Sequence, residues 1–119
     1  MVDFSSAFHV QKMNSGNPVV YLLREQFGSL IGIPQKIEAC DCIAGSLLQL
    51  GQVGEAAMWY EAAGLLMYRR SELPPELRAL YAIEEYEKAL RCHSEARDDE
   101  AEATCSELLR TLRKVCTPA

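Results

Sequence analysis

The stretch from Gly51 to Arg70 constrains the fold most, because it has the spacing of a helix but very little polar surface. Its apolar residues recur every three or four positions and form two adjacent stripes: Val53, Ala56, Tyr60, Ala63 and Met67 in one, and Trp59, Ala62 and Leu66 in the other. Glu55 and Glu61 are the charged residues before the closing arginine pair. A helix that is apolar almost all round packs on more than one side. We therefore expect a central helix with neighbours on both flanks, or with a partner on one.

The composition is typical of one folded domain, covering residues 1–119. Of the 119 residues, 49% are hydrophobic, which is enough for an independent core. The net charge is −5 and there is no basic block, which argues against nucleic acid as a partner. Charged residues are much scarcer in residues 1–60 than in 61–119. This charge-poor half has two interpretations, a buried core or an exposed apolar groove for a partner.

The cysteines and the first residues indicate a reducing compartment. The five cysteines, an odd number without the spacing of a disulfide framework, are Cys40, Cys42, Cys92, Cys105 and Cys116. The start MVDFSSAFHV lacks the basic residues and the apolar run of a signal peptide, and no apolar run reaches membrane-spanning length. We expect a cytoplasmic protein with free thiols and no membrane insertion.

Two strong breaks, NSGNP at 14–18 and SELPP at 71–75, divide the chain into helical segments. The first segment begins at Pro18 and ends at Gly32 and Pro34; its start, Val19-Val20-Tyr21, also suits a strand, but its spacing favours a helix. Further helices are expected over 36–50, 51–70, 75–94 and 99–116, and a short one near Ser5 would make six. The sequence thus predicts an all-α chain of five or six helices and up to three hairpins.

Local signals also predict how these helices end and which sides they bury. Gly51 is expected at the C′ position, where it would make a tight αα-hairpin of 36–50 and 51–70. Asp99 and Glu102 have the spacing of a capping box. The expected buried stripe of 75–94 is Ala79, Ile83, Tyr86, Leu90 and His93, and its expected wet side is Glu84, Glu85, Glu87, Lys88 and Arg91. The expected stripe of 99–116 is Ala101, Cys105, Leu108, Leu112 and Val115.

Residues 37–70 resemble a tetratricopeptide repeat (TPR), a helix–turn–helix unit of about 34 residues. Gly51 occupies the turn position of that family, Ala56 and Ala63 its small positions, and Tyr60 its aromatic position. The first helix departs from the family pattern, because Cys40 stands where tryptophan is preferred. The resemblance implies a right-handed stack of antiparallel helix pairs, with a degenerate unit at 3–36 and an atypical C-terminal pair at 75–116. The small alanines would let paired helices approach closely, and Tyr60 would reach the next unit.

Small acidic proteins with three such hairpins resemble the TPR-type chaperones of bacterial type III secretion. In that family a concave groove holds an amphipathic helix of an exported subunit. The resemblance rests on size, charge and repeat type.

Motifs for chemistry are absent from the sequence. Cys40 and Cys42 would point to nearly opposite sides of a helix, and so would not bind one metal ion. Cys92 and His93 diverge similarly. The sequence has no phosphate-binding loop, no HExxH and no GxSxG. We expect no enzyme activity, no cofactor and no metal.

The expected function is therefore protein binding, with a partner's amphipathic helix laid in an apolar groove. The residues expected to line that groove are Val20, Leu23, Phe27, Leu47, Trp59 and Leu66. A hetero-oligomer with this partner is expected, and a homodimer stays open. The alternative is a structural adaptor or self-assembling subunit, and a third hypothesis is a thiol- or metal-dependent enzyme.

Overall fold

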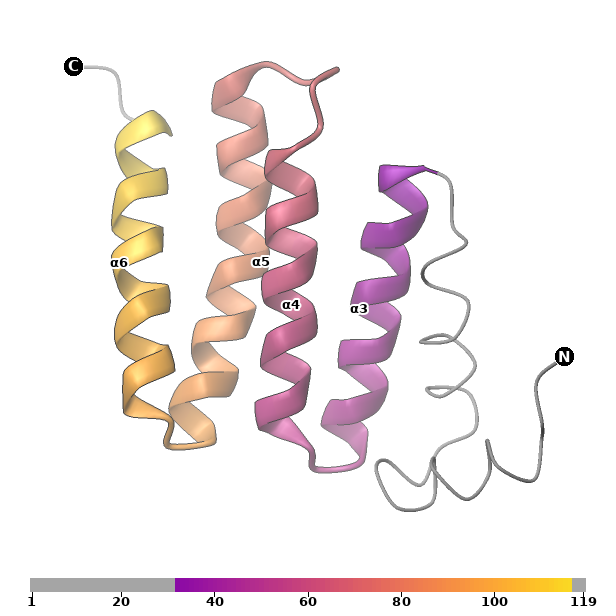
Figure 1. Cartoon of the computed structure of the whole chain (residues 1–119), viewed down its shortest axis with the longest axis vertical. Coiled ribbons are helices and arrows are strands. Elements are labelled where there is room, and N and C mark those ends of the chain that lie inside the picture. The colour runs from indigo at the N-terminus through magenta and orange to yellow at the C-terminus, as the bar shows by residue number, and fades with distance from the viewer. Residues whose placement is uncertain (1–31, 117–119) are drawn as a thin grey trace, which may run out of the picture.

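A computed structural model describes residues 32–116 of the chain (Figure 1). This part consists of α3 (Ile33–Gln49), α4 (Val53–Tyr68), α5 (Pro75–Glu95) and α6 (Asp99–Cys116), and contains no strand. The all-α prediction is confirmed for this part, which holds four helices. The predicted helix that begins at Pro18 and the short one near Ser5 lie outside the described residues, and so does most of the unit expected at 3–36.

Prolines mark the starts of two helices. α3 begins at Ile33, earlier than the predicted start, with Pro34 in its first turn. Pro34 was expected to end the preceding segment, but its fixed φ and missing N–H also suit the first turn of a helix. Pro75 is the first residue of α5, as predicted.

The turn between α3 and α4 is a Schellman motif built on Gly51. Gly51 has φ +79°, which glycine adopts without steric cost. The Gly51 N–H donates to the Leu48 carbonyl (3.0 Å) and the Gln52 N–H to the Leu47 carbonyl (2.9 Å). The predicted C′ role of Gly51 and the tight hairpin are confirmed.

The turn between α5 and α6 repeats this motif with Arg97 in place of glycine, at φ 59°. The Asp98 N–H donates to the His93 carbonyl (3.0 Å). Asp98 also caps α6, because its Oδ1 accepts from the Ala101 N–H (3.1 Å). The capping box predicted from Asp99 and Glu102 is therefore wrong by one position: Asp99 is the first helical residue and Asp98 is the cap.

The four helices form a row in which each packs on its neighbours in the sequence (Figure 1). α4 lies between α3 and α5, as its apolar circumference predicts. Ala56 and Ala63 are fully buried, and Ala63 packs with Ile37 and Cys40 of α3. Tyr60 reaches α5, where Lys88 Nζ lies 5.6 Å from its ring centre. Small residues thus bring α3 and α4 together, and Tyr60 connects α4 to α5.

Two predictions about buried sides need correction. Glu85 was placed on the wet side of α5, but it is only 4% exposed. In α6, Leu109 is fully buried, whereas Leu108 and Val115 of the predicted stripe are each 37% exposed. Both errors have one cause: the helical period identifies a buried stripe, but neighbouring helices on several sides decide how wide it is.

Candidate protein-binding surface

The residues predicted to line a groove have different environments. Leu47 is fully buried in the main core and so offers no surface to a partner. Trp59 and Leu66 are half-buried on α4, packed against the smaller cluster of Ile37, Cys40 and Ala63. The structure therefore brings Trp59 and Leu66 together. Val20, Leu23 and Phe27 lie outside the described residues.

A different face of α4 carries the most exposed apolar residues of that helix. Met58 is 63% exposed, Leu65 46% and Tyr68 38%. These positions are seven and three residues apart, so they follow one side of the helix, here termed the α4 outer face. The sequence stripes did not include these residues. The available signal was the scarcity of charge in α4, which leaves apolar side chains on its solvent side.

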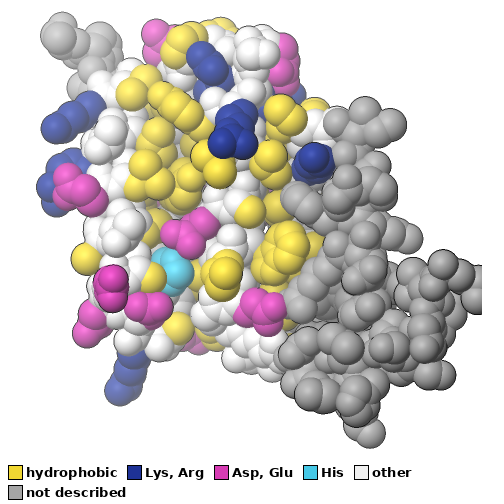
Figure 2. Space-filling view, viewed as in Figure 1, with side chains coloured by type: hydrophobic (Ala, Val, Ile, Leu, Met, Phe, Trp, Pro, Cys, Tyr) yellow, Lys and Arg dark blue, Asp and Glu magenta, His cyan; other side chains and the backbone are white. Residues whose placement is uncertain are grey.

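Apolar residues are also exposed on α6. Leu108 and Val115, two turns apart, are each 37% exposed. Figure 2 shows hydrophobic side chains gathered across one face of the row, with basic side chains among them. An exposed apolar area bordered by polar groups is typical of an interaction site.

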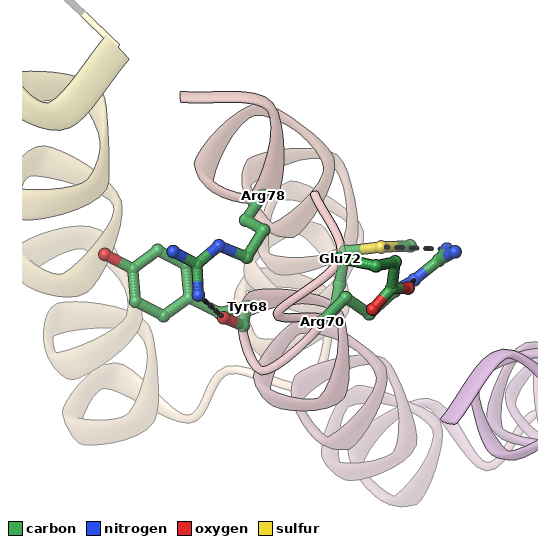
Figure 3. Close-up of polar contacts among 5 residues, drawn as sticks. Tyr68, Arg70, Glu72 and Arg78 are labelled. Carbon is green, nitrogen blue, oxygen red and sulfur yellow. Dashed lines mark hydrogen bonds and ion pairs between the residues drawn. The ribbon is translucent and has the colours of Figure 1, made fainter. Parts of the chain in front are cut away.

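Polar contacts hold the C-terminal end of the α4 outer face (Figure 3). Arg78 Nη1 donates to the Tyr68 carbonyl (3.5 Å), and the guanidinium carbon lies 5.8 Å from the Tyr68 ring centre. In the loop that follows, Arg70 Nε donates to Glu72 Oε1 (2.6 Å). The two contacts of Arg78 join the start of α5 to the end of α4, and so hold the Tyr68 ring at the edge of the surface.

Glu61 of α4 lies close to His93 of α5. His93 Nε2 is 3.3 Å from Glu61 Oε1, and the imidazole is almost fully buried whereas Glu61 is about one-third exposed. In Figure 2 the histidine has an acidic side chain beside it. The α4 outer face thus has an acidic group, Glu61, between Met58 and Leu65, and basic groups, Arg70 and Arg78, at its C-terminal end.

The buried thiols are unsuited to nucleophilic chemistry. Burial raises the pKa of Cys40 to about 12 and that of Cys105 to about 11. Cys105 Sγ lies 3.3 Å from the Tyr86 carbonyl, to which it donates. A nucleophilic cysteine needs a lowered pKa, so these two thiols fit a structural role.

Two surface hollows are formed by residues that the structure describes. One, of about 320 Å³, lies between the start of α5 and the end of α6, and is lined by Pro74, Glu76, Leu77, Leu80 and Cys116. The other, of about 400 Å³, is lined by Leu48, Tyr60, Lys88, Arg91, Cys92 and Glu95. Among residues 32–116, no three histidine, cysteine or acidic side chains are grouped so that they could hold a metal ion. No helix in this part is both long and apolar enough to cross a membrane.

Comparison of the chain with protein-family models, with curated proteins and with solved structures found no match.

Proposed function

We propose that this protein is a non-enzymatic binding module that holds an amphipathic helix of a partner protein. The observation that supports this most directly is the α4 outer face, where Met58, Leu65 and Tyr68 are exposed on a helix with only two charged residues. Apolar anchors at helical spacing are what a helix-in-groove partner contacts. An aromatic residue at the edge of such a surface contributes strongly to binding.

The repeat architecture supports the same function. The backbones of the described helices pack against those of their sequence neighbours, as in helical-repeat proteins, where stacking leaves extended faces for a partner. We propose a TPR-like stack in which Gly51, Ala56, Tyr60 and Ala63 have the roles of that family. The partner class we propose, from the chain's size and negative charge, is an aggregation-prone subunit of a type III secretion system, kept soluble in the cytoplasm before export.

Photo-crosslinking from the surface tests where the partner binds. A photoreactive amino acid replaces Leu65 in the full chain, and in a second preparation it replaces Glu84, an exposed residue of α5 outside this surface. We expect a crosslinked partner peptide from position 65 and none from position 84. Equal crosslinking from both positions would show that the α4 outer face is not the site.

Affinity measurements with the identified peptide then test the apolar contact. Leu65→Ser should weaken binding at least tenfold, the effect of losing about 1.4 kcal/mol. Leu80→Ser is the matched control, because Leu80 is 48% exposed and Leu65 46%, but Leu80 lies on α5. It should change the affinity less than about twofold. If Leu65→Ser instead converts a stable homo-oligomer into monomers, the structural-adaptor function replaces the chaperone.

A further inference from the structure

A buried acidic cluster joins α3 to α5, two helices that are not neighbours in the row. Glu85 of α5 is 4% exposed, and its Oε1 accepts from Lys88 Nζ at 2.9 Å. Asp41 of α3 lies within hydrogen-bonding reach of Glu85. The cluster thus has two carboxyl groups and one ammonium group, so it carries one excess negative charge when both acids are ionised.

Two oxygen atoms of this cluster are buried without a donor. They are Asp41 Oδ1 and Glu85 Oε2, and neither has a hydrogen-bond partner in the structure. A buried acceptor that no group satisfies costs roughly 1–3 kcal/mol, and more when it is charged. One proton between the two carboxyl groups would supply the missing donor and neutralise the excess charge.

Several other titratable groups lie around the cluster. From α4, the Tyr60 ring faces the Lys88 ammonium group at 5.6 Å. The Cys40 thiol of α3 lies near both acids, and the Cys92 thiol of α5 lies near Tyr60. Lys88 is the cation that acts on Asp41, and it is already bonded to Glu85.

We infer that Asp41 and Glu85 share one proton, and that this proton makes the contact between α3 and α5 sensitive to pH. Loss of the proton would place two negative charges against each other where α3 meets α5. Within the described residues, the other helix that α3 packs on is α4. The repulsion between the two carboxylates therefore weakens the attachment of α3 to the rest of the row.

The direction of the pH effect follows from the pKa of Asp41. Burial, and then the hydrogen bond and the charge of Glu85, raise this pKa from 3.8 to about 7, while Lys88 acts in the opposite sense. Between these two values the folded chain binds a proton that the unfolded chain has lost. The contribution of this proton to stability is therefore fully present below pH 3.8 and is lost as the pH rises through about 7. The unfolding constant would rise by up to about tenfold per pH unit in this window.

Unfolding measured as a function of pH tests the inference in the full chain. Asp41→Asn replaces the protonated acid by an amide, which donates a hydrogen bond at every pH. From pH 5 to pH 8, we expect its unfolding constant to rise at least tenfold less than that of the wild type. Glu107→Gln is the control, because Glu107 is an exposed acid paired with Arg110, and its pH profile should match the wild type. An unchanged pH profile in a folded Asp41→Asn variant would overturn the inference.

Carbon-13 NMR of the aspartate carboxyl groups gives a second test, and its deciding measurement is made on the wild-type chain. The Asp41 signal should titrate near pH 7, and Glu85→Gln should lower its midpoint by removing the acidic neighbour. A titration of Asp41 near its ordinary value of 3.8 would refute the shared proton, whether or not the variants fold.

Discussion

The ring of Tyr86 lies directly on the backbone of Gly64, where α5 crosses α4. A Cβ atom added to Gly64 would be 2.7 Å from Cε2 of the ring, closer than real Cβ contacts allow. Tyr86 is only 7% exposed, so its ring has little room to move. The absence of a side chain at Gly64 therefore sets how closely these two helices approach.

Gly64→Ala should destabilise the protein by about 1–2 kcal/mol, because overpacking outweighs the better helix propensity of alanine. Gly45→Ala is the matched control. Gly45 lies inside α3 with nothing within 4 Å of an added Cβ, so this change should stabilise by about 0.5–1 kcal/mol. Urea unfolding of both variants measures the difference. If both changes stabilise equally, the ring of Tyr86 does not pack as described.

Asp98 and Asp99 should differ in their contribution to stability although they are adjacent. Asp98→Ala removes the side-chain acceptor for the Ala101 N–H and should cost about 1 kcal/mol. Asp99→Ala keeps that cap and loses only a charge near the helix N-terminus, so it should cost about 0.5 kcal/mol or less. Thermal unfolding of the two variants compares them. The reverse order would return the cap to Asp99.

The cysteines should react with a thiol reagent in the order of their exposure. Cys42 is exposed and should react first, followed by the partly exposed Cys116. Cys40 and Cys105 should react slowly at pH 8, because burial raises their pKa to about 12 and about 11 and keeps them protonated. A fast phase that persists in the Cys42→Ser, Cys116→Ser double variant would reveal a reactive buried thiol and favour the enzyme hypothesis.

Local sequence signals predicted the described helices and the turn at Gly51, apart from the start of α3 and the cap of α6. Gly51 adopts the left-handed backbone conformation that ends α3. Within a helix, proline is best tolerated in the first turn, and Pro75 occupies that place in α5. The predicted α6, 99–116, agrees with the structure at both ends. Such signals act within a few residues, so they can be recognised without knowledge of the neighbouring helices. The alanines at 56 and 63 likewise indicated close packing, because only a small side chain lets two helices approach.

The tertiary structure alone decided which side chains are buried and which are available to a partner. Leu47, a predicted groove residue, is fully buried, whereas Met58 and Leu65 are exposed although they are equally apolar in the sequence. The sequence pattern predicts that Glu85 faces solvent, but Glu85 is buried beside Asp41, a residue forty-four positions before it in the chain. The period of a helix identifies its sides, but it carries no information about which helix covers each side. That depends on contacts between residues far apart in the chain, and these form only when the row of helices has assembled.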